Sequence, residues 1–512
     1  RGKPYSGSSD KKVKRTDHEL TKYLIKSVFK LPTMSFINYH PNSLIYINNR
    51  HTRFEQYKAD PACLGFLPSG HERGRDAASL FEDCLRRYMI RHCGWSDFSI
   101  EALRNDSDKA HRKHVATTFE QLDQYSLRQF LREIARVGNP KDSAKQIKSG
   151  EGVSLSRDAI DLICAVLAFE MSLSSSMADA VRMYSNIFRQ NEFDQIENGI
   201  DLLPRSFIGL PNHTASTSTS QFASDNERLN LSQNIVYNAR AVEIERMPPK
   251  SESDPVEDPI ERTDHLVITY ENVITRKMNQ SRADLVILAL PFSALRHIRM
   301  FKLASVAKRR ALRQLHYDNA CKILLEFSKP FWDGCEHPIK GGRSITDLPI
   351  RQTFYPNPKQ NRNAVLLASY TWGDDDSLRW ISLKADDRIR FALRDLGRVH
   401  AQDLSGLFVG GMSHSWAEHE YTSGAFSVFE PYQCVEMFED IWIPEGRLHY
   451  TGEHTSTKHA WIEGAEVGAQ LNILDEAVPT ALLHAYALEL RTPVSIPEQR
   501  DVSAKLSGLL QS

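Results

Sequence analysis

The chain has 512 residues, of which 41% are hydrophobic and 25% are charged, and its formal net charge is -1. This length predicts two or three cooperating domains that can enclose a large ligand, and the near-neutral charge argues against a nucleic-acid partner. No run approaches the roughly 20 apolar residues of a membrane span, and the seven cysteines are scattered without CxxC spacing, which argues against a disulfide framework and a zinc site.

The first predicted elements are a helix and a hairpin that follow a loose end. Residues 1–16 are rich in Gly, Ser and Lys and are predicted to be a disordered end. From Asp17 the spacing is helical until Pro32, at Leu20, Tyr23, Leu24 and Ser27. Residues 44–47 are apolar and β-prone and end at an Asn-Asn pair, so they predict the first strand of a hairpin.

Residues 76–190 are predicted to be largely helical. Two apolar faces with helical spacing are visible, one at Phe119, Leu122, Leu127, Phe130 and Leu131, and the other at Ile160, Ile163, Cys164 and Leu167. Ser156 is placed as an N-cap, and Asp158 in the first turn favours the helix dipole. The Gly- and Asn-containing segment 138–152 predicts a surface loop between them.

Strand patterns begin at Asn234, and they predict an α/β protein of mixed α+β character. The predicted strands are residues 235–237, 241–244, 266–270, 283–291, 323–327 and 365–370. The run 283–291 is apolar on both faces, as in a central strand buried beneath helices of a doubly wound sheet. The segment from Lys322 to about Phe429 predicts a second region in which strands and helices mix.

The most informative segment joins a strand to a helix through a Gly-Glu turn. It reads Gly452-Glu453-His454-Thr455-Ser456, followed by Ala460-Trp461-Ile462-Glu463-Gly464-Ala465. A glycine permits close backbone approach, a glutamate offers a carboxylate to ligand hydroxyls, and a helix N-terminus presents its positive end to an electron-rich ring. The alternative is a helix that packs on a strand with incidental glycines.

These strings resemble the C-terminal FAD-binding signature of the L-amino-acid oxidases and their flavin amine-oxidase relatives. Further resemblances follow in the family's order, from about Asp17 to about Asn472. They are Gly199-Ile200-Asp201-Leu202-Leu203-Pro204, the strands 241–244 and 283–291, Cys321-Lys322-Ile323, Phe331-Trp332, Thr346-Asp347-Leu348-Pro349 with Tyr355-Pro356, Ser369-Tyr370-Thr371-Trp372-Gly373-Asp374, and Trp416 with Gly424-Ala425-Phe426.

The resemblance implies a role for each matching residue. Lys322 would be catalytic, holding a water beside flavin N5, where a cation assists oxygen activation or imine hydrolysis; the alternative is a solvated lysine. Tyr355 would hydrogen-bond the substrate carboxylate, or it is a tyrosine in a turn before proline. The implied walls of the substrate cage, which could also be ordinary core residues, are Tyr370, Phe426, Trp461 and Ala460. The implied FAD-binding residues are Val242, Trp416, Gly452, Glu453, Trp461, Ile462, Gly464 and Ala465.

The same resemblance implies an incomplete, doubly wound FAD-binding domain beside a substrate-binding sheet domain and a helical domain. The substrate-binding domain is expected at 17–100 and 301–437, the helical domain at 101–190, the FAD-binding domain at 191–300 and 438–478, and a tail at 479–512.

Two family features are missing from the chain. No strand followed by a G-x-G-x-x-G turn is present for the FAD pyrophosphate, so the chain is expected to begin after that unit. Val13 occupies the place of the arginine that would bind the substrate carboxylate, with Lys14 or Arg15 as substitutes. At the last helix, Glu466 replaces a small or apolar residue, and it is expected either near the flavin or at the surface.

The expected function is FAD-dependent oxidative deamination of an L-amino acid to a 2-oxo acid, ammonia and hydrogen peroxide. Two alternatives are open: a degenerate relative that does not hold FAD, and an oxidase of amines or polyamines, which loss of the carboxylate-binding arginine favours. The expected partners are a small-molecule substrate, L-amino acid or amine, and dioxygen. A soluble protein, cytoplasmic or secreted, without metal and compatible with a homodimer, is predicted.

Overall fold

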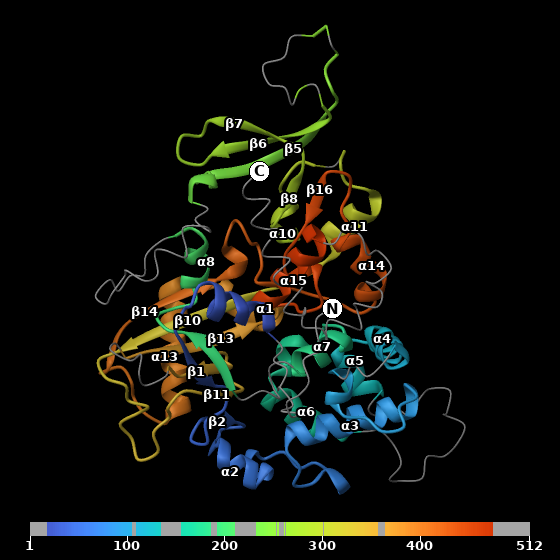
Figure 1. Ribbon diagram of the computed structural model, residues 1–512. Helices are drawn as coiled ribbons and strands as arrows, with labels where there is room; N and C mark the ends of the chain where they lie inside the picture. The colour runs from blue at the N-terminus through green and yellow to red at the C-terminus, as the bar shows by residue number, and fades with distance from the viewer. Residues whose placement is uncertain are drawn as a thin grey trace, which may run out of the picture.

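The computed structural model describes residues 18–104, 109–134, 155–185, 192–209, 232–251, 253–254, 261, 263–300, 302–356 and 364–474. Helices and strands mix throughout, so the prediction of a mixed α/β fold is confirmed (Figure 1). None of the described helices combines the length and the apolar composition that crossing a bilayer requires.

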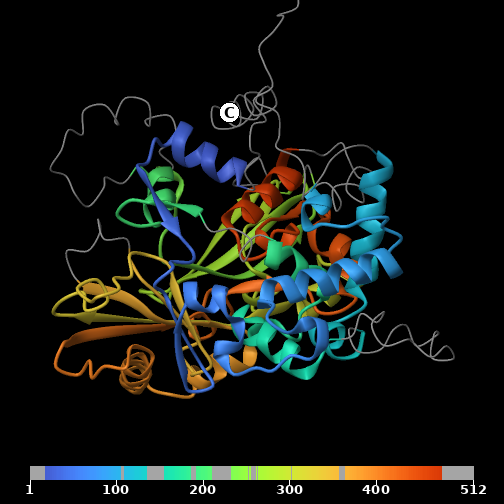
Figure 2. The ribbon, with the colours of Figure 1, turned by 90° about the horizontal axis from the view of Figure 1, so that it is seen from below.

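A seven-stranded sheet forms one side of the molecule, and Figure 2 draws its strands from the second half of the chain in yellow and orange and β2 and β3 in blue. Its strand order is β14 (Phe408–Ser415), β10 (Ala320–Phe327), β13 (Ala364–Trp372), β12 (Gln352–Phe354), β11 (Arg343–Thr346), β2 (Leu44–Ile47) and β3 (Arg50–Arg53). All neighbours are antiparallel except β11 and β2. The predicted hairpin at residues 44–53 and the strands 323–327 and 365–370 are therefore confirmed.

Long helix α13 (Ala385–His400) covers one face of this sheet, with α12 (Asp374–Ile381) beside it. Odd-numbered residues of β10 face α13, and Ile323 and Leu325 are fully buried there together with Leu396. Even-numbered residues of β10 face the other way because successive side chains of a strand alternate. This alternation puts Lys322 on the face opposite α13.

The described residues of the predicted helical segment form α3 (Ala77–His92), α4 (Lys109–Asp123), α5 (Leu127–Gln129), α6 (Arg157–Val166) and α7 (Met177–Met183). They pack around one hydrophobic cluster that includes Phe81, Phe119 and Ile163. The hydroxyl oxygen of Ser156 accepts a hydrogen bond from Ala159 N at 3.2 Å, which confirms the predicted N-cap of α6. The hydroxyl of Ser176 caps α7 in the same way.

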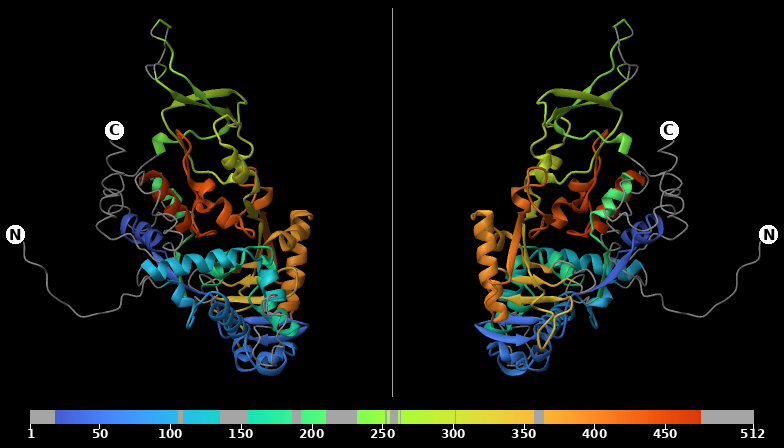
Figure 3. Two further views of the ribbon diagram at one scale, coloured as in Figure 1. Left: turned by 90° about the vertical axis from the view of Figure 1, so that its right-hand side faces the viewer. Right: turned by 90° about the vertical axis from the view of Figure 1, so that its left-hand side faces the viewer.

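A third region combines a three-stranded sheet with a short parallel pair. The sheet contains β5 (Ala239–Met247), β6 (His265–Asn272) and β7 (Met278–Ala283), and it projects away from the rest of the molecule (Figure 3). The parallel pair is β8 (Val286–Leu288) and β16 (Leu448–Tyr450), covered by α10 (Phe292–Leu295), α11 (Val306–Gln314) and α14 (Gln433–Trp442).

Two strand predictions in this third region are wrong. Residues 235–237 are exposed and precede β5, and none of the described strands pairs with them. The run 283–291 contains only three strand residues in β8, and Ile287 is 43% exposed, so the strand is not buried on both faces.

The N-terminal segment packs on the middle of the chain. Helix α1 (Glu19–Lys22) continues as a π-helix at Tyr23–Val28, and β1 (Thr33–Ile37) pairs with β4 (Glu192–Ile196), which leads to α8 (Leu202–Phe207). The remaining elements are α2 (Phe54–Ala59), β9 (His316–Asp318), β15 (Phe426–Val428) and α15 (Ile462–Leu474). The predicted helix after Asp17 is thus confirmed, whereas Val13, Lys14 and Arg15 lie outside the described residues.

Candidate functional site

Lys322 lies in a row of three side chains on three adjacent strands of the seven-stranded sheet. In β10 it is the direct partner of Tyr370 on β13 and of His414 on β14, and direct partners in antiparallel strands point to the same face. Its Nζ lies 4.9 Å from the centre of the Tyr370 ring. Burial lowers the pKa of Lys322. The row therefore presents a partly buried amine that gives up its proton more readily than an exposed lysine does.

Three of the predicted aromatic residues gather on this face of the sheet. Tyr370, Trp416 and Phe426 pack, partly buried, against one apolar cluster that includes Ala320 and Trp372. The ring of Trp416 lies 4.6 Å from that of His414, the neighbour of Lys322. The structure thus brings Lys322, Tyr370, Phe426 and Trp416 together.

A series of aromatic rings continues from Tyr370 toward Trp461, and sequence reasoning missed its middle members. Phe354 lies 6.1 Å from Tyr370 and 6.4 Å from Phe36, measured between ring centres. Phe36 and Phe193 are direct partners in the β1–β4 pair, and Phe193 stacks on Trp461 at 6.4 Å. The signal that could have found Phe354 is strand alternation at residues 352–355.

The structure does not bring Tyr355 to this face. Tyr355 is 1% exposed, and its hydroxyl lies 2.8 Å from both Ser344 Oγ and His400 Nε2, in the core between the sheet and α13. Burial raises the pKa of Tyr355. Because alternation turns adjacent residues to opposite faces, Phe354, and not Tyr355, points to the face that carries Lys322.

The glycines of the last turn allow α15 to pack closely on it. A Cβ on Gly464 would lie 2.1 Å from the carbonyl oxygen of Lys458, and one on Gly468 would lie 2.1 Å from Thr455 Oγ1. Gly452 has φ of 146°, a conformation that other residues rarely adopt. These glycines set the distance between the turn and α15. This packing role agrees with the alternative interpretation, in which the segment is a helix that packs on a strand.

The carboxylate of Glu453 connects this turn to β15. One oxygen accepts a hydrogen bond from Ser427 N at 2.9 Å, and the other accepts from Ser427 Oγ and Ala460 N, each at 3.0 Å. Ser427 follows Phe426, and Ala460 precedes Trp461. The described contacts of Glu453 are thus with the protein, and they hold Phe426 and Trp461 on the same side of the molecule.

The turn before α15 offers an apolar surface at the N-terminus of a long helix. Ala460 is exposed, Trp461 and Ala465 are partly buried, and Ile462 is 41% exposed. The positive end of α15 lies at this point. A flat, electron-rich ring that accepts negative charge fits this combination of accessible apolar side chains and helix dipole.

Residues for the other half of a dinucleotide are less evident in the described part of the chain. Val242 lies at a β-bulge of β5, and its carbonyl oxygen accepts a hydrogen bond from Arg299 N at 3.0 Å. Neither β8 nor β16 leads into a G-x-G-x-x-G turn in the described residues. The described residues therefore fit the flavin ring better than the pyrophosphate.

Glu463 and Glu466 of α15 bind the first helix. Glu463 accepts hydrogen bonds from Leu20 N at 3.2 Å and Thr21 N at 2.8 Å, and Thr21 Oγ1 donates to both carboxylates. Burial, and then the charge of Glu463, raise the pKa of Glu466 to about 7. Glu466 is thus partly buried at a junction with α1, where Thr21 Oγ1 lies 2.9 Å from its carboxyl group.

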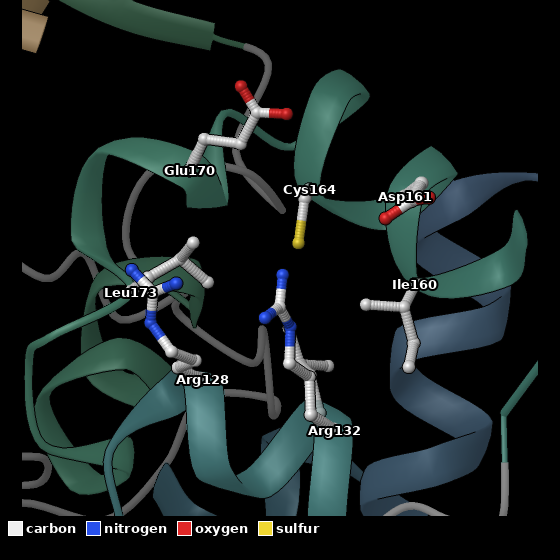
Figure 4. A pocket seen from close by; sticks show the side chains of 8 residues that line it. Arg128, Arg132, Ile160, Asp161, Cys164, Glu170 and Leu173 are labelled. Atoms are coloured by element: carbon white, nitrogen blue, oxygen red, sulfur yellow. The ribbon is translucent and has the colours of Figure 1, made fainter. Parts of the chain in front are cut away.

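A small cavity in the helical region contains none of the predicted site residues. Figure 4 shows the side chain of Arg132 pointing toward Cys164, with Arg128, Asp161 and Glu170 around them. Burial raises the pKa of Cys164 to about 12, so its thiol stays protonated.

Comparisons with known proteins agree on one group of relatives. The family model described as flavin containing amine oxidoreductase matches residues 234–467. The chain is 32% identical over 454 residues to "Putative L-amino-acid oxidase YobN" of Bacillus subtilis (strain 168), covering 88% of this chain and 79% of the relative. It is 27% identical to an L-amino-acid oxidase of Siganus canaliculatus, covering 88% of this chain and 72% of that protein.

A solved structure resembles the fold. Cyclohexylamine oxidase from Brevibacterium oxydans IH-35A matches with a TM-score of 0.53 and 12% identity, covering 92% of this chain and 86% of that one.

Proposed function

The chain belongs to the L-amino-acid oxidase family of flavin-containing amine oxidoreductases, and on this basis we propose that it oxidatively deaminates an L-amino acid with FAD as its cofactor. The products would be a 2-oxo acid, ammonia and hydrogen peroxide, formed from the amino acid, water and dioxygen. The observation that carries the proposal is the position of Lys322, on the same face as Tyr370, Phe426 and Trp416, with Glu453 joining that face to the Trp461 turn.

The bound flavin would supply the redox chemistry, taking a hydride from the α-carbon of the substrate and passing electrons to dioxygen. The protein residues would orient the substrate and control water. Tyr370, Phe426 and Trp461 would form apolar walls that exclude bulk water from the reacting atoms. The N-terminus of α15 would favour negative charge on the ring beside it.

Lys322 would hold one water in this apolar surrounding. Burial lowers its pKa, so the amine gives up its proton more readily than an exposed lysine does, and the neutral amine can accept a proton. A water bound to Nζ could then attack the carbon of the imino acid product, and the amine could take up the proton that the water loses. The 2-oxo acid and ammonia would follow.

A second candidate function is oxidation of an amine that lacks a carboxylate. It is favoured by Phe354, which lies at the site face where Tyr355 was expected to hydrogen-bond a carboxylate. The two candidates differ in one measurement, the release of hydrogen peroxide from L-amino acids compared with primary amines. Turnover of amines alone would reject the first candidate.

The test of the proposal begins with the full chain reconstituted with FAD. We expect bound flavin with its yellow absorbance and peroxide release from L-amino acids. Lys322→Met should slow turnover by roughly a hundredfold because a positioned acid–base group contributes about that factor or more. Lys329→Met is the matched control, since Lys329 follows the same strand and is exposed. A colourless folded protein, or equal rates for both variants, would contradict the proposal.

A further inference from the structure

A buried group of three charged or titratable side chains joins the helical region to the turn that carries Trp461. Asp179 on α7 accepts a hydrogen bond from Arg182 Nη1 at 2.8 Å through one oxygen, and its other oxygen lies 3.2 Å from His459 Nδ1. The three side chains are between 5% and 11% exposed. Such burial makes the loss of one partner costly because it leaves the other charge unpaired.

The same carboxylate also holds the end of β15. Phe429 N donates a hydrogen bond to Asp179 Oδ2 at 2.8 Å, and Ser176 N donates to the Phe429 carbonyl at 2.7 Å. The Phe429 ring lies 4.5 Å from the ring of His459. Helix α7 and its N-cap thus fix both β15, which begins with Phe426, and the turn that leads to Trp461.

The turn needs such support because Ala460 is held in a left-handed conformation. Its φ is 66°, and for a residue with a side chain this conformation is disfavoured because the Cβ comes too close to the following carbonyl oxygen. Ala460 N donates to Glu453 Oε2 at 3.0 Å, and the preceding residue is His459. Glu453 on one side and Asp179 on the other therefore determine the direction in which Trp461 leaves the turn.

The charges around His459 favour its imidazolium form. Burial opposes that form, but the charge and hydrogen bond of Asp179, together with the charge of Glu453, outweigh burial and Arg182, so the pKa of His459 is raised. In the same turn His454 has its pKa lowered by burial to about 3 and stays neutral, and the Lys458 ammonium lies 3.9 Å from Glu463. Asp179 keeps its pKa below the usual range despite burial because His459 and Arg182 face it.

We propose that the Asp179–His459 pair positions Trp461, so that the helical region sets the shape of the substrate cage. The proposal rests on the proposed function in so far as Trp461 borders the substrate. His459 is a positioning residue, because it acts through the direction of the Ala460–Trp461 segment. With His459 uncharged, the turn loses its ionic attachment to α7 while its covalent structure is unchanged.

The first test requires no flavin. The fluorescence of Trp461, isolated as the difference between the parent chain and Trp461→Phe, should change as pH rises through the raised pKa of His459. His459→Gln should abolish this pH-dependent change, and so should Asp179→Asn. Asp83→Asn is the matched control, since Asp83 forms ion pairs with Arg75 and Arg87 within the helical region. If the pH dependence of Trp461 emission is the same in both variants as in the parent chain, the proposal is overturned.

The second test uses kinetics of the reconstituted enzyme. Asp179→Asn and His459→Gln should each lower kcat/KM by about tenfold to a hundredfold, the range expected from misplaced positioning groups. The double variant should lose no more than the worse single variant, because both changes release the same contact. The parent enzyme should lose activity as rising pH removes the charge of His459. This loss should be absent in His459→Gln. Additive losses, or equal losses in Asp83→Asn, overturn the proposal.

The two tests separate this inference from the proposed function. Shifted Trp461 emission in the variants of a chain that releases no peroxide supports the positioning role and rejects the oxidase assignment. Circular dichroism tests whether each variant is folded. If Asp179→Asn does not fold, His459→Gln alone decides the result.

Discussion

The seven-stranded sheet and the turn that leads into α15 form the two sides of the candidate site, and they are stabilised differently. The sheet side depends on apolar burial: Ile323 and Leu325 of β10 are fully buried beneath α13. The turn side depends on polar contacts between distant segments, through Glu453, Glu463 and Asp179. Its parallel strand β8 leaves Ile287 43% exposed. Lys322 is thus placed by apolar packing of its strand, and Trp461 by polar contacts of its turn.

The largest effect is expected from removing an apolar side chain on the sheet side. Leu325→Ala should lower the free energy of unfolding by about 3 kcal/mol, because it deletes buried methyl groups and leaves a cavity. Ile287→Ala should cost less than about 1 kcal/mol, since that side chain is 43% exposed in β8. Urea titration of both variants measures the difference. Equal losses would show that β8 is as tightly packed as β10.

A smaller loss is expected from filling the space at a glycine on the turn side. Gly464→Ala places a Cβ 2.1 Å from the Lys458 carbonyl oxygen, so the turn must shift, at a cost of roughly 2 kcal/mol. Gly410→Ala on β14 is the control, because nothing lies within 4 Å of its added Cβ. Thermal unfolding should separate the two variants. A stable Gly464→Ala protein would mean that α15 does not pack tightly on the turn.

Tyr355 provides a test of which face of the sheet meets substrate. Tyr355→Phe removes the hydroxyl that lies 2.8 Å from Ser344 Oγ and His400 Nε2, so stability should fall by about 1 kcal/mol. The KM for an L-amino acid should stay the same, because the hydroxyl lies on the α13 side. A raised KM with unchanged stability would instead place Tyr355 in the substrate site.

The last expected effect depends on pH and arises at the junction of α15 with α1. The pKa of Glu466 is raised to about 7, so between its ordinary value and pH 7 the folded chain binds a proton that the unfolded chain has lost. Stability should therefore fall as pH rises through this interval, and Glu466→Gln should remove that part of the slope. The exposed Glu436 supplies the control, Glu436→Gln. Unfolding midpoints at pH 5 and at about pH 7.5 test it, and identical slopes would reject the assigned titration.

Local patterns sufficed to predict much of the fold. Runs of strand-forming residues located the core strands β10 and β13, and Ser156 followed by Asp158 located the start of α6. The strand prediction for residues 235–237 is wrong because β-prone side chains form a strand only beside a partner strand, and none of the described strands pairs with them. The prediction that the run 283–291 is buried on both faces is wrong because burial depends on the elements that pack against the strand.

The candidate site was predicted less completely, for two physical reasons. The face to which Phe354 and Tyr355 point depends on strand parity, which a shift of one residue reverses. The contacts of Glu453 with Ser427, and of Asp179 with His459, join residues far apart in the chain. Such pairs follow from the tertiary arrangement, and they cannot be recognised from the local sequence.

The junction between Thr21 and Glu463 also constrains how the chain is made. Its two residues are separated by 442 positions, so nearly all of the described chain must leave the ribosome before they can meet. At a synthesis rate of roughly 5–20 residues per second, this delay is on the order of a minute. Docking of helix α1 on α15 can therefore occur only on molecules whose translation has passed α15.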